Sequence, residues 1–556
     1  MIPEGCFLFT KKEVQNQASS ELYGYGITKD SIIFNSEGLR EYCLKNATQN
    51  WPTEGRFCGI FIEKERIIVK TDKTGQDLLY FFESENDWAV SNSFLLLLKY
   101  ASQQIKLTFL PEIAAGFHLK NGQHIGEQLI SHQTMVEEIK VIPLTWELHI
   151  CRKTKEAKFE KFNYLTRFKM PQDVNYEQTI TDVLQDGAGV LTALSQKGYT
   201  LNPHLSGGYD SRLVMCMLSI AKINHNIKVS SYEHKVDDFQ SAQKICKHFN
   251  LPLNQKRILQ KNYLSAGEAL RAYLMSCGGT YLPFYAIHDF KQRSPVEIVL
   301  TGDQPTGWSF FAGNAQFNGN AAKIGNDIVE FLGPQPYGEK LRHQFLTTFE
   351  ILGIEQTHPA AMLAHYNAIR SRYHCGRNWY KSMGSRLLFT PLMDSRFIAM
   401  DLHNLEHGHH PTKVFVDAFL ATGEWALSIP FETPERKFDE DLVKNSPFRE
   451  GANLTPNQFT VYGTPYSEER NDSPDIYDIP TEVGFNDQMM KQCLERTFYA
   501  AKLAKKSEVF TDEDIQMALE EIRNSGNLSH GYRKLMHIIF VDMVLRSISS
   551  SKEHIY

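Results

Sequence analysis

The sequence has no apolar run of the roughly 18 to 20 residues that a membrane-spanning helix needs. Its nine cysteines are scattered and form no C-x-x-C pair, which favours buried thiols over a zinc site or a disulfide framework. Charges of both signs are interspersed around a net charge of −6, so no basic face indicates nucleic-acid binding. The first residues carry no basic segment followed by an apolar one. We therefore expect a cytoplasmic protein that binds neither membranes nor nucleic acid.

A glycine-rich turn follows an apolar segment near residue 200. Residues 206–211 read SGGYDS and are called the glycine loop below. Residues 199–205 before the loop are typical of a buried strand, and residues 211–220 after it of a helix. Adjacent glycines let a backbone approach a phosphate closely, and a helix start presents N–H groups and a positive dipole end to an anion. The spacing is not the G-x-x-x-x-G-K-[ST] of a Walker loop.

These residue types suit the binding of pyrophosphate. The hydroxyl groups of Ser206 and Ser211 add donors, and the carboxylate of Asp210 can hold a divalent cation against the same phosphates. The backbone of Leu205, Gly207 and Gly208 completes the expected ATP-binding and pyrophosphate-binding set. An ordinary helix N-cap turn is the alternative interpretation of the same residues.

Two further segments predict strands of the same sheet. Residues 226–232 are followed by a helical pattern, and residues 296–303 form a β-branched run that ends in Gly302 and Asp303. Alternating strands and helices predict an open parallel sheet whose ligands lie at the carboxyl ends of the strands. Ser230 and Tyr232 then border the adenine, or are ordinary strand residues, while Gly302 joins the nucleotide site.

The S-G-G-x-D-S motif resembles the pyrophosphate loop of the N-type ATP pyrophosphatases, and the chain as a whole resembles the asparagine synthetase family. Several other segments carry the likeness: residues 55–61 (GRFCGIF), 72–81 (DKTGQDLLYF), 89–92 (AVSN), 237–238 (DD), 389–396 (FTPLMDSR) and 436–438 (RKF). Alternating apolar patterns before residue 165 are typical of antiparallel sheets.

The resemblance implies two domains. Residues 1–165 are expected to form a glutamine-amidotransferase-like α+β domain of packed antiparallel sheets, similar to the Ntn hydrolases. Residues 176–556 are expected to form an α/β parallel-sheet ATP pyrophosphatase domain with helical additions, which is the synthetase domain. Residues 446–484 show little periodicity and are predicted to be a long irregular region.

Two departures from the family pattern bear on activity. Glutamine-dependent members expose a cysteine after the initiator methionine, whereas this chain has Ile2, and Cys6 lies too far in; we expect no glutaminase activity. Family members also carry an acidic pair after the strand that ends in Gly302-Asp303, and here Thr306 and Gly307 replace it. A non-catalytic nucleotide-binding relative is therefore one alternative, and an intramolecular cyclase of the β-lactam-synthetase or lasso-peptide type is another.

The resemblance favours an ATP-dependent, AMP-forming carbon–nitrogen ligase. A small-molecule or peptide carboxylate is adenylated with release of pyrophosphate, and ammonia or an amine donor then takes up the acyl group. The expected cofactors are ATP and Mg²⁺, with Asp210 and Asp303 as metal ligands. Lys437 is the first choice for the catalytic lysine and Lys413, in a "K-x-x-L-R"-like helix, the second; a homodimer is left open.

Overall fold

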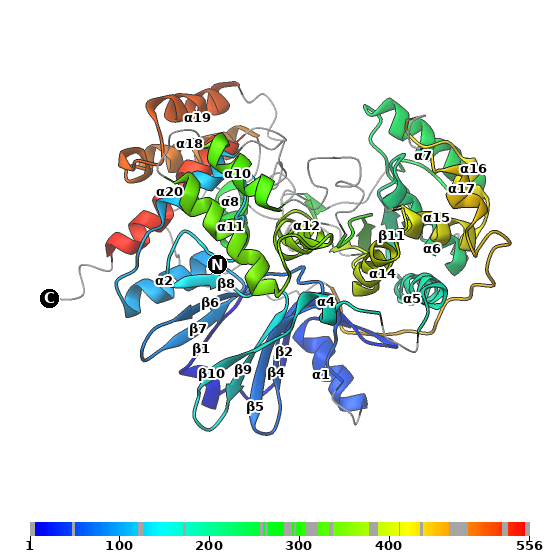
Figure 1. The fold of residues 1–556 in the computed structure, drawn as a ribbon, viewed down its shortest axis with the longest axis horizontal. Coiled ribbons are helices and arrows are strands. Elements are labelled where there is room, and N and C mark those ends of the chain that lie inside the picture. The colour runs from blue at the N-terminus through cyan, green and yellow to red at the C-terminus, as the bar shows by residue number, and fades with distance from the viewer. Residues whose placement is uncertain are drawn as a thin grey trace.

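The computed structural model describes residues 6–46, 50–119, 126–170, 174–223, 225–255, 260–261, 265–282, 292–293, 296–306, 321–332, 337–376, 387–410, 412–433, 437–465, 487–524 and 532–550. It shows a mixed α/β protein with antiparallel and parallel sheets and many helices (Figure 1). None of the helices within these ranges is both long and apolar enough to cross a membrane.

The first part of the chain forms two sheets. One has seven strands in the order β10-β9-β5-β4-β2-β3-β16, and the other has four in the order β1-β7-β6-β8. Apolar side chains from both sheets meet in one cluster that includes Ile60, Val69, Phe81, Val90 and Ile150, so the sheets pack face to face. The strands are β1 (Leu8–Thr10), β2 (Glu21–Ile27), β3 (Ser31–Phe34), β4 (Glu54–Ile62), β5 (Arg66–Thr71), β6 (Tyr80–Glu83), β7 (Trp88–Ser91), β8 (Ile139–Val141), β9 (Trp146–Cys151), β10 (Ala157–Lys161) and β16 (Thr460–Tyr462).

The strand β16 is a correction to the sequence interpretation. Residues 446–484 were expected to be irregular, yet β16 pairs in parallel with β3 at the edge of the seven-stranded sheet. A run of three residues carries no periodic signal, and its partner lies more than 400 residues away, so only the tertiary structure reveals the pairing. Residues 466–484 of that region lie outside the described residues.

The parallel sheet predicted around the glycine loop is present. It contains β11 (Thr200–Pro203), β14 (Glu297–Leu300) and β15 (Leu387–Phe389), paired in parallel in that order. Parallel bridges from Leu201 to Ile227, from His204 to Ser230 and from Val229 to Leu253 extend it on the other side of β11. The predicted strand at residues 226–232 thus takes its expected place, although as isolated bridges.

Helices cover this parallel sheet. They are α5 (Tyr176–Gln196), α6 (Tyr209–Ala221), α7 (Val236–Phe249), α14 (Ser395–Glu406) and α15 (Lys413–Thr422), and they lie around β11 in Figure 1. Their apolar faces and the sheet share one core that includes Leu184, Leu201, Leu213, Ile298 and Phe419. The apolar strand residues are buried on both faces, as is usual for a parallel sheet.

Helices from the second half of the chain also pack on the first half. One core cluster joins Tyr80 and Phe82 of β6 to Leu270, Phe345 and Ile539. The cluster contains α2 (Phe94–Gln104) of the first part of the chain and, from the second part, α8 (Ala266–Cys277), α10 (Ala321–Phe331), α11 (Gly338–Leu352), α12 (Ala361–His365), α18 (Asp487–Ala500), α19 (Asp512–Asn524) and α20 (Arg533–Ser550). The division into residues 1–165 and 176–556 therefore stays a prediction, and packing crosses it.

Candidate functional site

The glycine loop lies at the carboxyl end of β11, where the sequence placed it. The Leu205 N–H donates to the carbonyl of Ser230 over 2.8 Å, which ties the loop to the neighbouring parallel segment. The two serines close the turn, because the Ser206 N–H donates to Ser211 Oγ over 3.1 Å and the two hydroxyl oxygens lie 3.1 Å apart. The Gly208 N–H donates to Ser206 Oγ over 3.3 Å. The loop is thus folded around its serine hydroxyl groups.

Helix α6 starts directly after the two glycines. Its N-cap residue is Gly208, with φ −82° and ψ 176°, and no side chain makes a capping hydrogen bond there. Helix starts without a side-chain cap direct N–H groups and a positive dipole end outward. Glycine is itself a common N-cap residue, so the ordinary N-cap interpretation and the pyrophosphate-binding interpretation both stay predictions.

Gly207 is held between two segments distant in sequence. Its N–H donates to Asp238 Oδ1 over 2.8 Å, so the aspartate pair at the start of α7 contacts the loop. A Cβ atom on Gly207 would lie 2.4 Å from the Cβ atom of Glu432, which leaves no space for a side chain. The rings of Phe431 and Phe438 lie 4.9 and 4.7 Å from the ring of Tyr209.

This packing brings Lys437 to the neighbourhood of the loop. Lys437 directly precedes Phe438, whose ring stacks on Tyr209 at the start of α6, and Lys437 itself is exposed. Residue 436, which carries part of the family-like RKF segment, lies outside the described residues.

Lys413 is placed differently. Its Nζ lies 2.6 Å from Asp417 Oδ2 and 5.1 Å from the centre of the Tyr176 ring. Asp417 also accepts hydrogen bonds from the hydroxyl groups of Tyr176 and Ser446. Lys413 is thus engaged in a nearly buried ion pair within α15, and no contact between Lys413 and the glycine loop is found among the described residues. The segment of Lys437 packs beside the start of α6, and the choice of catalytic lysine stays a prediction.

The turns that follow β11 and β14 lie in close contact. A Cβ atom on Gly302 would lie 2.6 Å from the Ser211 backbone nitrogen and 2.9 Å from Asp210 Cβ, so only glycine fits at this position. Asp210 Oδ1 accepts a hydrogen bond from the side-chain amide of Gln304 over 2.7 Å. Asp303 Oδ2 accepts one from the Thr301 hydroxyl over 3.0 Å.

The charges of Asp210 and Asp303 affect the pKa of the same two buried groups. After burial itself, both carboxylates are among the charges that raise the pKa of the Tyr366 phenol and of the Cys375 thiol. The two acids therefore face a common region near π-helical turns at Tyr366–Arg370 and Arg372–Gly376, a backbone form often found at functional sites. Within the described ranges no group of three or more His, Cys, Asp or Glu side chains gathers for a metal. Mg²⁺ that also binds phosphate and water needs only one or two carboxylates, and its binding by Asp210 and Asp303 stays a prediction.

Ser230 and Tyr232 differ in their suitability for an adenine site. The Ser230 hydroxyl donates to Asn202 Oδ1 over 2.8 Å and stays within the sheet. Tyr232 is 61% exposed and lies 5.4 Å from the His234 ring, beyond the end of the strand. Both interpretations of these two residues remain predictions.

Arg56 is a buried residue that the sequence interpretation did not single out. It belongs to β4 of the antiparallel sheet, is fully buried, and donates through Nη2 to the Cys375 carbonyl and to Thr390 Oγ1, each over 3.2 Å. Its Nε and Nη1 make no hydrogen bond with the part of the chain that the structure describes. Sequence offers no signal for this contact, because Arg56 and Thr390 are 334 positions apart.

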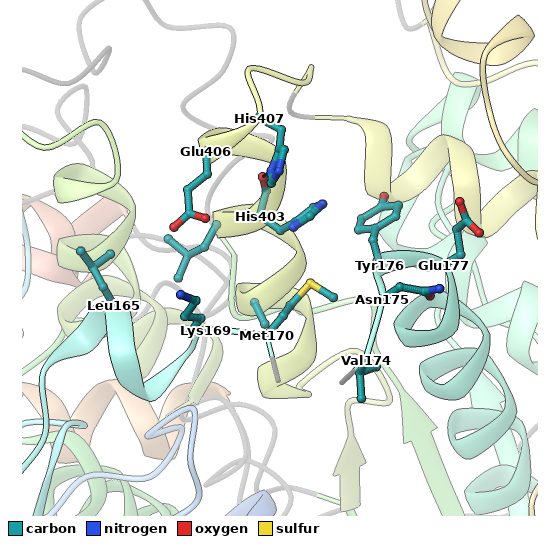
Figure 2. Close-up of a pocket in the computed structure, with 12 residues that line it drawn as sticks. Leu165, Lys169, Met170, Val174, Asn175, Tyr176, Glu177, His403, Glu406 and His407 are labelled. Atoms are coloured by element: carbon teal, nitrogen blue, oxygen red, sulfur yellow. Dashed lines mark hydrogen bonds between the residues drawn. The ribbon is translucent and has the colours of Figure 1, made fainter. Parts of the chain in front are cut away.

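A pocket of about 440 Å³ lies elsewhere, between residues 165–177 and α14. Figure 2 shows Leu165 and Lys169 on one side, Tyr176 on the other, and His403 and His407 between them on α14. The two histidine rings lie 4.2 Å apart. No residue of the glycine loop lines this pocket, so it is separate from the candidate nucleotide site.

Comparisons with known proteins add little to this geometry. No protein-family model and no curated protein matches the chain. One solved structure with some similarity is glutamine phosphoribosylpyrophosphate (PRPP) amidotransferase from B. subtilis, complexed with ADP and GMP. The two share 11% sequence identity over 59% of this chain and 58% of that one, with a TM-score of 0.13. A likeness this weak supports neither a fold nor a function, and the asparagine-synthetase resemblance stays a prediction. The position of Ile2 lies outside the described residues.

Proposed function

We propose that this protein is an ATP-dependent amide-bond-forming ligase that adenylates a carboxylate, releases pyrophosphate and passes the acyl group to ammonia or an amine. The observation that carries the proposal is the contact between two strand ends: the glycine loop after β11 and the Gly302-Asp303 turn after β14. Parallel α/β sheets bind ligands where neighbouring strands end. In this proposal the first 165 residues form an Ntn-amidotransferase-like domain without glutaminase activity.

In the first half-reaction the glycine loop holds the departing pyrophosphate. The substrate carboxylate attacks the α-phosphate of ATP, and charge builds up on the leaving oxygens. Backbone N–H groups at the start of α6 and the hydroxyl groups of Ser206 and Ser211 are donors suited to that charge. Asp210 and Asp303 would hold Mg²⁺, which would supply further neutralisation of the phosphate charge.

In the second half-reaction an amine attacks the acyl-adenylate, giving an amide and AMP. We assign to Lys437 the stabilisation of charge near the α-phosphate in both half-reactions. Its support is the stacking of the adjacent Phe438 on Tyr209, which brings the segment to the loop. Lys413 is less suited to that role because its ammonium group is paired with Asp417.

The direct test is carboxylate-dependent exchange of labelled pyrophosphate into ATP, with a panel of amino acids and uronic acids. Asp210→Ala is expected to lower the exchange rate at least 100-fold, because a charge that is stabilised in the transition state is typically worth 10²–10³ in rate. Lys437→Met is expected to lower it to a similar degree. Lys413→Met serves as the matched lysine control and is expected to keep the exchange rate within about threefold at a temperature where the variant stays folded.

Two outcomes contradict the proposal. Equal exchange rates for the wild type and Asp210→Ala would show that the Asp210 carboxylate does not take part in the reaction. Binding of nucleotide without exchange for any carboxylate in the panel favours the non-catalytic alternative instead. Product formation from a single substrate without an added amine identifies the cyclase variant of the same chemistry.

A further inference from the structure

The first three N–H groups of the glycine loop are all occupied by acceptors of the protein itself. The Ser206 N–H donates to Ser211 Oγ over 3.1 Å, and the Gly208 N–H donates to Ser206 Oγ over 3.3 Å. Between them, the Gly207 N–H donates to Oδ1 of Asp238 over 2.8 Å, the shortest of the three hydrogen bonds. A phosphate oxygen that uses these donors therefore has to replace an internal acceptor.

The three acceptors differ in how they respond to an anion. A serine hydroxyl group is both a donor and an acceptor, so Ser206 and Ser211 can rotate and donate to a phosphate oxygen. An ionised carboxylate only accepts, and its negative charge repels a phosphate. Asp238 is thus the acceptor that must leave before a phosphate oxygen can take the N–H of Gly207.

Asp238 reaches Gly207 from the first turn of α7. It belongs to the aspartate pair at residues 237–238 that resembles a family motif, and the proposed function gives neither aspartate a role. The dipole of α7 stabilises a carboxylate in this turn. The side chain of Asp238 is 20% exposed, so the carboxylate can leave the loop without disturbing a core.

Lys235 offers the carboxylate of Asp238 a second partner. Its Nζ lies 4.0 Å from Oδ2 of Asp238, and its side chain is 58% exposed. Exposed ion pairs contribute little to stability, so this one can shorten or lengthen at low cost. The carboxylate can therefore move from the Gly207 N–H toward the ammonium group and water. The Gly207 carbonyl still accepts from the Glu432 N–H over 3.3 Å, which keeps the loop in place during that movement.

We propose that Asp238 is an internal competitor for the anion site, whose carboxylate occupies the Gly207 N–H until pyrophosphate or the terminal phosphates of ATP displace it. The inference rests on the proposed function, because the glycine loop is assigned there to the departing pyrophosphate. The carboxylate returns to the N–H group after the chemical steps. Its return favours the release of pyrophosphate and regulates how long the product stays bound.

The experiment measures the affinity of the full-length protein for inorganic pyrophosphate by calorimetry, with and without Mg²⁺. Asp238→Ala removes the competing carboxylate. Asp238→Asn keeps an oxygen acceptor for the Gly207 N–H but removes the charge. Asp237→Ala is the matched control, because Asp237 is an exposed aspartate in the same helix turn. Melting temperatures without pyrophosphate check that each variant is folded.

Asp238→Ala is expected to bind pyrophosphate about tenfold more tightly than the wild type, because a hydrogen bond to a charged acceptor no longer has to be broken. Asp238→Asn is expected to gain about threefold, since a neutral acceptor competes less strongly. Asp237→Ala is expected to stay within about twofold of the wild type, because exposed charges are screened at physiological salt. In the exchange assay, the KM for pyrophosphate should fall in Asp238→Ala and stay unchanged in Asp237→Ala.

Two results overturn the inference alone. Unchanged or weaker binding by Asp238→Ala, while the wild type binds pyrophosphate, would show that the carboxylate supports the loop or binds the cation. An equal gain in Asp237→Ala would show that net charge sets the affinity. No binding by the wild type or by any variant would instead refute the assignment of the glycine loop to pyrophosphate, and the proposed function with it. Binding by Asp238→Ala without binding by the wild type would support the inference.

Discussion

Single residues decide how closely the two strand ends approach at the candidate site. Gly207 and Gly302 each lie where a Cβ atom would overlap a neighbour, and neither requires a positive φ. Their role is thus to permit contact between segments, whereas the sequence interpretation gave the glycines of the loop a close approach to phosphate. Glu432 and Asp238 pack on Gly207, so contacts with other segments contribute to the conformation of the loop along with its own sequence.

Gly302→Ala tests this contact. The added methyl group would lie 2.6 Å from the Ser211 nitrogen, so the turn and the loop must separate. Overpacking of this kind typically lowers the free energy of unfolding by about 1–3 kcal/mol. We expect pyrophosphate exchange to fall more than this modest loss of stability explains, because the donors of the loop move relative to Asp303.

The matched control is Gly325→Ala in α10. A Cβ atom there would lie 3.3 Å from Cγ of Arg342, a flexible side chain, and alanine favours a helix. This variant is expected to keep both exchange and melting temperature. Normal exchange in Gly302→Ala would show that the contact is not needed.

Helix α14 brings together groups from both halves of the protein. Its N-cap Asp394 accepts from the Arg396 backbone, and Arg396 also binds Asp186 of α5. Glu54, from β4, accepts hydrogen bonds from both the backbone N–H and the hydroxyl group of Ser395. One helix start thus joins the antiparallel sheet to α5.

Titration of Glu54 is expected to make the stability of the contact between β4 and α14 depend on pH. Burial and the neighbouring carboxylate of Asp394 raise the pKa of Glu54 to about 7, from an ordinary value of 4.5. The folded state therefore binds a proton more tightly than the unfolded state, and stability that is fully present below pH 4.5 is lost as the pH rises through 7. Between pH 5 and 7.5 we expect Glu54 to account for a loss of roughly 1–3 kcal/mol.

Glu54→Gln removes the ionisable group while it keeps an acceptor for Ser395. Urea midpoints at pH 5 and 7.5 should differ less in this variant than in the wild type. Glu63→Gln, which removes an exposed carboxylate paired with Arg66, should leave the wild-type difference unchanged. If Glu54→Gln keeps the wild-type difference in urea midpoint between pH 5 and 7.5, a group other than Glu54 causes that difference.

At the scale of the whole molecule, two buried arginines link the first part of the chain to residues 372–390. Arg372 is 1% exposed and donates to the carbonyl groups of Gly75, Ile142 and Asp77. Arg56 reaches in the other direction, to Cys375 and Thr390. Since two of the apolar clusters contain residues from both halves, apolar packing also joins the two parts of the chain.

Arg372→Met is expected to lower the free energy of unfolding by about 3 kcal/mol, because it leaves three buried carbonyl groups without their donor. The measurement is urea unfolding followed by both tryptophan fluorescence and circular dichroism. Arg342→Met, which removes an exposed pair with Glu339, should change stability by less than about 0.5 kcal/mol. Equal stability of the two variants would mean that the Arg372 bonds do not join the halves.

The sequence by itself determined the local features of this protein. The glycine loop, the strand before it and the helix after it follow from neighbouring residues, as do the antiparallel hairpins of the first half, because apolar periodicity and turn residues act over short distances. It also placed Asp210, Gly302 and Asp303 at adjoining strand ends, since parallel strands end at one edge of a sheet.

Only the tertiary structure decided which distant groups complete the site. The contacts of Asp238 with Gly207, of Gln304 with Asp210 and of Arg56 with Thr390 join residues that no spacing rule relates, and β16 pairs with a strand more than 400 residues away. The tertiary structure also showed that Lys413 pairs with Asp417, whereas Lys437 is exposed; which lysine is catalytic stays a prediction. The physical reason is that burial and hydrogen-bond partners arise from packing between elements, and a linear pattern records only the face that each element buries.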